Sequence, residues 1–377
     1  MPKSTANRLR IGFVLDDGLD KPDGVQQYVL TLGDWLIKQG HYVRYLVGGT
    51  KRTDIKEAIP MTRNISVRFN GNSLSTPLPA SPTKVRRILK REKFDVLHVQ
   101  VPHSPFMGAR IVAAAPKRTR IIGTFHILPT GKMQYYATRL LGFSLHRNLK
   151  KFDKFLSVSG PAKRFAEEAF KINSEVLPNP VDIEKFKRKP ARSPGKTVNI
   201  LFLGRLVPRK GCIHLLEAVD KMLEANGAMD IKVDICGSGY QHDSLLQFIN
   251  SSRLKGIATM HGFVSEEHKI DFLNRADLAV FPSTSGESFG IVLIEAMAAG
   301  AGIVLAGNNP GYASVLASVP DSLFDPADTR GLSEKMYELI KNRTRFQIMH
   351  DEQQQLVKKF DIKPIGQKML DIYTGRS

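Results

Sequence analysis

The sequence predicts an α/β protein built from two Rossmann-like domains, each a doubly wound parallel sheet. Three observations support this class. Short apolar segments alternate with helical patterns along the whole chain, a segment rich in Lys, Arg and Pro separates two halves, and the halves differ strongly in charge. At 377 residues two domains are more usual than one, and a hydrophobic content of 42% is enough for two buried cores.

Short apolar runs mark the expected strands. In the first half they are RIGFVL, YVRYLV, VLHVQV, RIIGTF and KFLSVS. In the second half they are VNILFLG, IKVDICG, ATMHGF, LAVFPS and GIVLAG. Because the segments between these runs have helical periodicity, we expect the strands to be parallel and connected by helices.

The segment KFKRKPARSPGK, residues 185–196, has the composition of a linker. We therefore place an N-terminal domain at residues 1–187 and a C-terminal domain at residues 188–357. A last helix, within residues 358–377, is expected to pack back on the N-terminal domain. Two such domains joined by a linker should face a deep cleft, with ligands bound at the strand ends beside it.

The N-terminal segment, the short apolar runs and the two cysteines suggest a cytosolic protein. The N-terminal MPKSTANRLRIGFVL has only a short apolar run, which is typical of a first strand and too short for a signal peptide. No apolar run approaches the roughly 20 residues of a membrane-spanning helix. Cys212 and Cys236 lie in an expected helix and an expected buried strand, so we interpret them as reduced core residues.

The positive charge is concentrated in the first half. Residues 1–200 contain 36 Lys and Arg against 15 Asp and Glu, whereas the remaining residues contain 19 against 21. Such a basic half implies an anionic partner: a nucleic acid, a membrane surface or an acidic substrate. A nucleic-acid-binding protein is the alternative of a different class. It would require aromatic residues interleaved with the cations, or a reading helix, and we find no recognisable motif of this kind.

Residues 81–92, SPTKVRRILKRE, form an expected amphipathic helix. Ser81 suits the N-cap and Pro82 the first helical position, and Val85, Ile88 and Leu89 then share one face. Two interpretations stay open: a solvated charged face, or a helix that docks on a membrane surface. The other faces carry Lys84, Arg86, Arg87, Lys90 and Arg91.

The segment SGESFGIVLIEAMAAGAG places two acids, Glu287 and Glu295, among small and apolar residues. It is expected to follow the strand LAVFPS as a glycine-containing loop and then a helix. Free N–H groups at the start of such a helix suit a phosphate or a sugar oxygen. Buried carboxylates need partners, so we expect both glutamates to accept hydrogen bonds from sugar and ribose hydroxyls.

The segment FLGRLVPRKG is a strand end followed by a loop with Arg205 and Lys210. An arginine fork and a lysine point charge at a strand end would suit a diphosphate. Two solvated cations on a turn are the alternative. The later CGSGY, residues 236–240, is a weaker signal, because the third glycine and the downstream acid of a dinucleotide fingerprint are missing.

Taken together, GRLVPRKG and ESFGIVLIEAMAAG resemble glycosyltransferase family 4, whose members have the GT-B fold. KPDGVQQYV, FDVLHVQVPH, GTFH, SVSGPAKRF and LPNPVDIEKF extend the resemblance over nearly the whole chain. Within the family, DGVQ and ESFGIVLIEAMAAG are similar to segments of the phosphatidylinositol mannosyltransferases. The resemblance implies a retaining hexosyltransferase that moves mannose from GDP-mannose to a lipid such as phosphatidylinositol.

The resemblance also implies roles for individual residues around a nucleotide-sugar donor. Arg205 and Lys210 would hold the diphosphate, Glu287 the sugar hydroxyls and Glu295 the ribose. The remaining donor contacts would come from the backbone N–H groups of Phe289 and Gly290, from Val264 and Lys269 beside the nucleobase, and from Gly24 beside the diphosphate.

On the acceptor side, the resemblance implies that His126 lies at the reacting sugar and that Gln26 binds the acceptor. His126 could also be an ordinary core histidine and Gln26 a helix cap, and we interpret His103 as structural. No Asp-x-Asp pattern is present, and the adjacent Asp16 and Asp17 have the wrong spacing, so we expect no metal and no other cofactor. In the mannosyltransferases the helix matching residues 81–92 docks on membranes, which implies a peripheral protein at the inner face of the plasma membrane.

Three positions depart from the family pattern. Asp23 replaces one of two adjacent glycines, Asp17 replaces an aromatic residue of the phosphatidylinositol enzymes, and Pro180 replaces a glycine. The first two concern the acceptor side, so the acceptor stays open, and so does the choice between GDP and UDP. A UDP-hexose-dependent diacylglycerol glycosyltransferase is the alternative enzyme.

Overall fold

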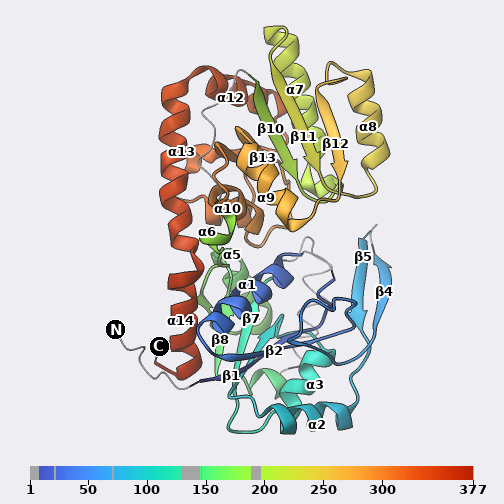
Figure 1. Ribbon diagram of the computed structural model, residues 1–377, viewed down its shortest axis with the longest axis vertical. Coiled ribbons are helices and arrows are strands. Elements are labelled where there is room, and N and C mark those ends of the chain that lie inside the picture. Colours follow the sequence, from blue (N-terminus) through green and yellow to red (C-terminus); the bar gives the residue numbers. More distant parts are fainter. Residues whose placement is uncertain are drawn as a thin grey trace. The chain divides into compact units, whose positions relative to one another are not determined.

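A computed structural model describes residues 8–20, 23–69, 72–128, 145, 147–187 and 197–376. The chain divides into two compact units (Figure 1). Unit 1 comprises Met1–Pro180 and Ile362–Ser377, and unit 2 comprises Val181–Asp361. Each unit contains one parallel sheet packed with helices, which confirms the predicted class of two Rossmann-like α/β domains.

The sheet of unit 1 has seven strands in the order β3-β2-β1-β6-β7-β8-β9, and all its neighbouring pairs are parallel. A separate antiparallel hairpin, β4 (Asn64–Phe69) and β5 (Asn72–Pro77), was not predicted from the sequence. The strands of the large sheet are β1 (Arg10–Leu15), β2 (Tyr42–Val47), β3 (Ala58–Pro60), β6 (Val96–Gln100), β7 (Arg120–Phe125), β8 (Lys154–Ser157) and β9 (Glu175–Val176).

Two groups of helices cover the faces of the unit 1 sheet. On one face, Phe13 of β1 and Tyr45 of β2 pack with Leu32 of α1 and Met369 of α14. On the other face, α2 and α3 pack against the same strands. The last helix of the chain therefore belongs to the core of unit 1. The helices are α1 (Gly24–Lys38), α2 (Pro82–Glu92), α3 (Met107–Ala114), α5 (Gly160–Phe170) and α14 (Ile362–Thr374).

Helix α2 has the predicted amphipathic arrangement. Val85, Ile88 and Leu89 are buried in the core that α2 shares with the sheet and α3. Pro82 occupies the first turn, whereas Ser81 stands at the N-cap position without a side-chain capping hydrogen bond. The side chains on the remaining faces are exposed: Lys84, Arg86, Arg87, Lys90 and Arg91.

The sheet of unit 2 has six parallel strands in the order β12-β11-β10-β13-β14-β15, which is the doubly wound order. The strands are β10 (Val198–Leu203), β11 (Ile231–Cys236), β12 (Ala258–Gly262), β13 (Leu278–Phe281), β14 (Ile303–Gly307) and β15 (Leu323–Phe324). The helices are α6 (Ile183–Phe186), α7 (Cys212–Asn226), α8 (His242–Ser251), α9 (Glu266–Arg275), α10 (Ile291–Ala298), α11 (Pro310–Val315), α12 (Thr329–Lys341) and α13 (Arg343–Val357).

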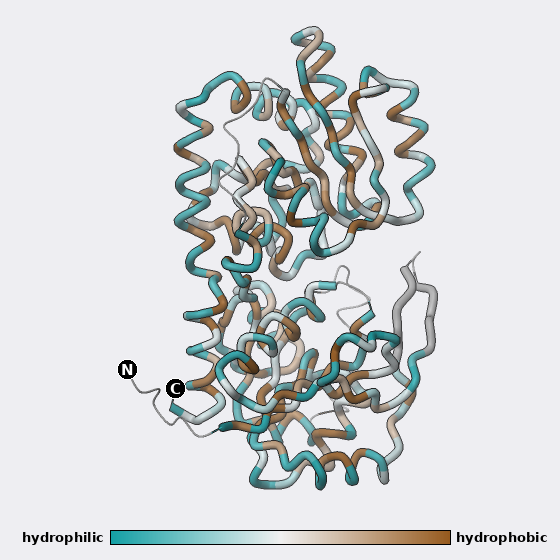
Figure 2. Tube along the Cα trace, in the orientation of Figure 1, coloured by the Kyte–Doolittle hydropathy of each residue, from teal (hydrophilic) through white to brown (hydrophobic). Residues whose placement is uncertain are grey.

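The pattern of hydropathy along the chain explains which face of each helix is buried. In Figure 2, surface helices such as α8 and α13 alternate between hydrophilic and hydrophobic residues, as expected for helices with one buried face. Cys212 and Cys236 are buried free thiols, as predicted, and burial raises the pKa of each. Within the described part of the chain, no helix combines the length and the apolarity that crossing a membrane requires.

The boundaries between the units differ from the expected ones at residues 187 and 357. Val181 donates its backbone N–H to the carbonyl of Phe360 at 2.8 Å, and α6 packs on α10, so residues 181–187 belong to unit 2. The 3₁₀ turn Lys358–Phe360 continues from α13, and the C-terminal helix begins only at Ile362. Composition placed the boundary at the basic segment, but hydrogen bonding and packing decide it. Of the expected linker, residues 188–196 lie outside the described residues.

The order of the strands reverses between β1 and β6 in unit 1 and between β10 and β13 in unit 2. Open parallel sheets bind ligands beside the carboxyl ends of the strands at such switch points. Arg205 and Lys210 follow β10, and Glu287 follows β13. Gln100 ends β6, and His126 follows the neighbouring strand β7. The fold therefore places several predicted site residues at the two switch points.

Candidate functional site

The loop after β10 is held close to the end of β13. Gly211 ends the 3₁₀ turn Pro208–Lys210 with a φ of 69°, a conformation that favours glycine. A Cβ atom at this position would lie 2.1 Å from the carbonyl oxygen of Pro282, which follows β13. The backbone N–H of Thr284 also donates to the carbonyl of Arg209 at 2.9 Å. This close approach brings the basic loop and the glutamate loop together.

The carboxylate of Glu287 is the centre of the unit 2 site. Its Oε1 atom accepts from Arg209 Nη1 at 2.7 Å, from Lys210 Nζ at 2.9 Å and from Ser283 Oγ at 2.9 Å. Burial alone would raise the pKa of Glu287, but Lys210 and Arg209 outweigh it, and the pKa is lowered. Glu287 is therefore an ionised carboxylate at neutral pH. Arg205, the other predicted cation of the loop, is exposed.

Glu295 lies in α10 and is 6% exposed. Its Oε1 accepts from Lys269 Nζ of α9 at 2.8 Å, and the same ammonium lies 2.9 Å from Glu266. Burial raises the pKa of Glu295, and Lys269 opposes this rise. We expected hydroxyl groups of a ligand to satisfy Glu287 and Glu295. Cations of the protein already pair with both carboxylates, so burial alone does not require a ligand, and the hydroxyl contacts stay a prediction.

The start of α10 is a tight turn. Gly290 stands at its N-cap with a φ of 124°, and a Cβ atom there would lie 2.7 Å from the ring of Tyr312. Phe289 is buried and packs edge-on against Phe360 at a ring distance of 5.7 Å. These packing constraints fix the backbone whose N–H groups are the predicted donors.

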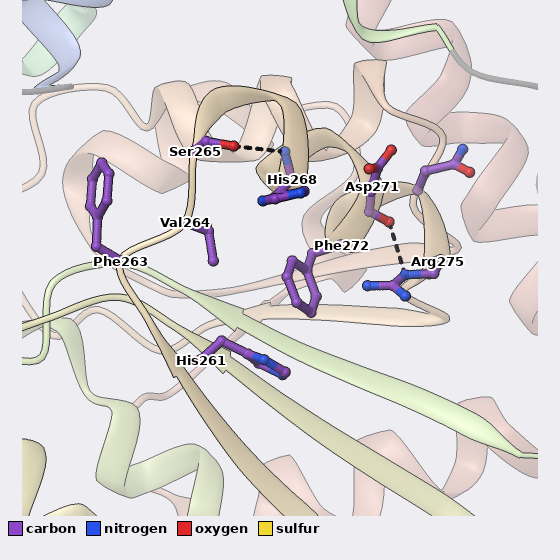
Figure 3. A pocket seen from close by; sticks show the side chains of 9 residues that line it. His261, Phe263, Val264, Ser265, His268, Asp271, Phe272 and Arg275 are labelled. Carbon is purple, nitrogen blue, oxygen red and sulfur yellow. Dashed lines mark hydrogen bonds between the residues drawn. The ribbon is translucent and has the colours of Figure 1, made fainter.

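A cavity of about 640 Å³ lies beside α9 (Figure 3). Val264, the predicted nucleobase contact, lines it together with the largely exposed Phe263. Lys269 does not line it, because its side chain is buried toward Glu295 instead. Of the two residues predicted beside one nucleobase, Val264 therefore lines this cavity and Lys269 does not. The complete lining is His261, Phe263, Val264, Ser265, His268, Asp271, Phe272, Asn274 and Arg275.

In unit 1, His126 is buried directly after β7, with 6% of its surface exposed. Its Nε2 atom lies 2.7 Å from Oε1 of Gln100, the last residue of β6. The ring of Tyr28 meets it edge-on at 4.8 Å. Burial lowers the pKa of His126 to about 3, so the ring is neutral at physiological pH. His103 is also buried and stacks on Phe125 at 5.6 Å.

The predicted acceptor residue, Gln26, is buried in α1. Its Nε2 donates to Asp17 Oδ2 at 3.2 Å and to the carbonyl of Gly18 at 3.3 Å. Its Oε1 has no hydrogen-bond partner within the described residues. Gly24 begins α1 and is exposed, and Asp23 forms no side-chain cap there. The departure at Asp17 therefore holds the amide nitrogen of Gln26, and among the described residues no group pairs with its Oε1.

The structure adds three residues that sequence reasoning missed. Arg209 and Ser283 contact Glu287, and Gln100 contacts His126. Arg209 immediately precedes Lys210 in VPRKG, so its position in a strand-end loop was an available signal. Ser283 and Gln100 are ordinary polar residues at strand ends, and only the pairing of strands makes them neighbours of the site.

Solved structures of glycosyltransferases resemble the chain over nearly its full length. A glycosyltransferase from Rickettsia africae has a TM-score of 0.74 at 19% identity, covering 98% of each chain. Alr3699/HepE from Anabaena, in complex with UDP and glucose, has a TM-score of 0.75 at 16% identity, covering 97% of this chain and 100% of that one. These likenesses define the two units as a GT-B fold.

Two family models match the sequence, each over one half of it. Residues 183–359 match "Glycosyl transferases group 1", and residues 22–185 match "Glycosyltransferase Family 4". The phosphatidyl-myo-inositol mannosyltransferase of Mycobacterium tuberculosis H37Rv is 31% identical over 78% of this chain and 77% of that protein. The Mycobacterium leprae protein of the same name is 30% identical over 97% of this chain and 96% of that protein. The chain belongs to glycosyltransferase family 4.

Proposed function

We propose that the protein transfers mannose from GDP-mannose to a membrane lipid such as phosphatidylinositol. The observation that carries this proposal is the ionised Glu287, which Arg209 and Lys210 hold where β10 and β13 end. A carboxylate suits sugar hydroxyls, and adjacent cations suit a diphosphate. Mannose and the lipid come from the relatives, which are named phosphatidyl-myo-inositol mannosyltransferases.

The donor would rearrange the ion cluster of unit 2. Because Lys210 Nζ lies 2.9 Å from Glu287, a diphosphate that binds Lys210 competes with this carboxylate. Release of Lys210 frees carboxylate oxygens for hydroxyl groups of the sugar, while Arg209 keeps Glu287 ionised. Arg205 provides the second cation for the diphosphate, and the N–H groups of Phe289 and Gly290 hydrogen bond the donor.

The nucleoside would occupy the neighbouring part of unit 2. Glu295 accepts from the ribose hydroxyls, and Lys269 acts through Glu295 rather than through the base, because its ammonium is buried against that carboxylate. Val264 packs on the base. A ribose contact and an apolar contact to the base suit GDP and UDP alike, so the donor base must be measured.

From unit 1, Gly24 would allow the chain to approach the diphosphate, and His126 would contact the reacting sugar. We propose front-face attack with retention of configuration, in which stabilisation of the leaving diphosphate by cations replaces a protein nucleophile. The same cations make a metal unnecessary for charge neutralisation. Turnover should therefore persist in excess EDTA; a loss that Mg²⁺ or Mn²⁺ restores would contradict this part of the proposal.

The acceptor would bind near Gln26. Its unpaired Oε1 and the carboxylate of Asp17 are both hydrogen-bond acceptors, so they favour a headgroup that donates hydroxyl protons. An inositol ring offers such hydroxyls, and diacylglycerol offers one.

A donor-by-acceptor assay tests the function directly. GDP-mannose, UDP-glucose and UDP-N-acetylglucosamine are each incubated with vesicles containing phosphatidylinositol or diacylglycerol, and the released nucleotide and the glycolipid are measured. We expect GDP release and a mannosylated phosphatidylinositol. Transfer from UDP-glucose to diacylglycerol would instead support the alternative enzyme. No transfer in any combination would overturn the proposed function.

Helix α2 provides the proposed membrane contact. Each Lys or Arg near an anionic leaflet contributes about 1 kcal/mol, so removing three cations should weaken binding on the order of 100-fold at low salt. We expect the triple variant Lys84→Ser, Arg86→Ser, Arg87→Ser to co-sediment poorly with anionic vesicles and to lose activity on lipid. Its affinity for GDP should not change.

A matched variant controls for net charge. Lys232, Lys255 and Lys359 are exposed lysines of unit 2, and their combined replacement by Ser removes the same three charges elsewhere. This control should sediment with vesicles like the unmodified protein. Equal vesicle binding by both triple variants would show that α2 is not the docking surface.

A further inference from the structure

A buried polar chain lies beneath His126. His98 and Gln100 are two residues apart in β6, so their side chains lie on the same face of the sheet. Helices α1 and α14 cover that face. Gln100 is 2% exposed and His98 is fully buried. In the parallel register Gln100 stands opposite Thr124 of β7, two residues before His126. The chain is therefore built on two central strands rather than on loops.

The hydrogen bonds of Gln100 determine the orientation of its amide. Its Nε2 donates to the backbone carbonyl of His98 at 3.2 Å, so its Oε1 faces His126. Exchanging the two amide atoms would set one carbonyl oxygen against another. The 2.7 Å contact between Gln100 Oε1 and His126 Nε2 is therefore a hydrogen bond in which the imidazole must donate.

This donation selects one tautomer of His126. A neutral imidazole carries a single proton, and burial keeps this ring neutral. With the proton on Nε2, the lone pair of the ring is on Nδ1. The ring orientation is further restricted by Tyr28, whose ring lies 4.8 Å away at an interplanar angle of 68°.

The supports of Gln100 are themselves fixed. His98 Nδ1 lies 2.7 Å from the hydroxyl of Tyr373 in α14, and His98 Nε2 lies 2.6 Å from Thr124 Oγ1. Both ring nitrogens of His98 are thus engaged by neighbouring elements of unit 1. These contacts hold the His98 ring, and the pairing of β6 with β7 holds the backbone carbonyl that Gln100 contacts, so the surroundings of Gln100 are ordered, as a positioned catalytic group requires.

We propose that Gln100 is a positioning residue that holds His126 as the neutral Nε2–H tautomer. In this tautomer the Nε2 proton is committed to Gln100, so His126 does not act as an acid through Nε2 at the reacting sugar. The tautomer itself follows from this geometry, whereas its use on a sugar rests on the proposed function.

Nitrogen-15 NMR of histidine-labelled protein tests the tautomer without donor or acceptor. The His126 signals are identified by their loss in the variant His126→Gln. In the unmodified protein we expect a protonated Nε2 and an unprotonated Nδ1. A protonated Nδ1 with an unprotonated Nε2 would overturn the proposal, whether or not any sugar transfer is found.

Variants at position 100 test whether Gln100 determines the tautomer of His126. Gln100→Met removes the acceptor, and we expect a mixture of tautomers and a fall in turnover of about tenfold or more at unchanged affinity for the nucleotide. Gln100→Glu, whose buried carboxyl group is expected to be protonated, can donate its hydroxyl to the His98 carbonyl and keep an acceptor oxygen toward His126, so it should keep the Nε2–H tautomer. A single unchanged tautomer in folded Gln100→Met would refute the role of Gln100.

A second buried amide provides the matched control. Gln353 is 1% exposed and hydrogen bonds the backbone N–H and carbonyl of Val304 in unit 2. Gln353→Met removes a similar amide and should leave the His126 tautomer unchanged. If the His126 tautomer also changed in Gln353→Met, the effect would come from general loosening of the protein, and the proposal would be overturned.

Discussion

Unit 1 should lose stability in mild acid, because it buries three neutral histidines. Burial lowers the pKa of His98 and of His126 to about 3 and that of His103 to about 4. In the unfolded chain a histidine titrates near pH 6.5. Below that pH the unfolded chain therefore binds protons that the folded unit does not. Protonation of these histidines costs no stability above about pH 6.5, and the cost grows as the pH falls toward 4 for His103 and toward 3 for His98 and His126.

The variant His103→Phe isolates one third of this effect. The His103 ring stacks on Phe125 at an interplanar angle of 8° and lies 4.8 Å from Phe170, so a phenylalanine fits the aromatic surroundings. Its Nδ1 has no hydrogen-bond partner within the described residues, so the replacement breaks no bond there. From pH 6 to pH 5 each buried histidine costs about 1.2 kcal/mol, and three cost about 4 kcal/mol.

Urea unfolding followed by tryptophan fluorescence measures this loss in unit 1. Trp35 is the single tryptophan of the chain, and its ring packs on Gly366, where α1 meets α14. We expect the loss in unfolding free energy between pH 6 and pH 5 to be about 1.2 kcal/mol smaller in His103→Phe. The exposed His268 of unit 2 provides the control variant, His268→Gln, which should keep the full loss. An equal pH dependence in His103→Phe and the unmodified protein would refute the reasoning.

Three further variants probe unit 2. Glu287→Ala should lower turnover about 30- to 1000-fold, from a loss of 2–4 kcal/mol of hydrogen bonding, in a protein whose circular dichroism is unchanged; near-normal turnover would remove Glu287 from the site. Lys210→Ala should weaken GDP or UDP binding in calorimetric titration, and unchanged affinity would return Lys210 to a surface role. Gly211→Ala should destabilise unit 2 by more than about 2 kcal/mol in thermal unfolding, because its Cβ would meet Pro282. Gly256→Ala, at a turn glycine with a φ of 81° and open space around the added Cβ, should cost only about 1 kcal/mol; equal losses would contradict the steric argument.

Local sequence patterns were sufficient for the elements of the fold. The central strand β13 is entirely apolar, and β10 is apolar except for Asn199; such runs are typical of strands buried on both faces. In α2 the spacing of Val85, Ile88 and Leu89 predicted the buried stripe that the structure contains. The hairpin β4–β5 escaped prediction: β4, NISVRF, alternates polar and apolar residues, but its partner NSLSTP is almost entirely polar and gives no strand signal.

The sequence by itself determined the fold class, the family resemblance and the positions of Glu287 and Lys210 beside strand ends, because these depend on periodicity and on residues close together in the chain. Only the tertiary structure decided the partners of the acids. Arg209 and Glu287 are 78 residues apart, and Lys269 and Glu295 are 26 apart. Likewise, Gln100 reaches His126 only because β6 and β7 are neighbours in the sheet. A buried charge or imidazole pairs with whichever polar group the packed strands bring within about 3 Å. The sequence of one segment does not determine that distance.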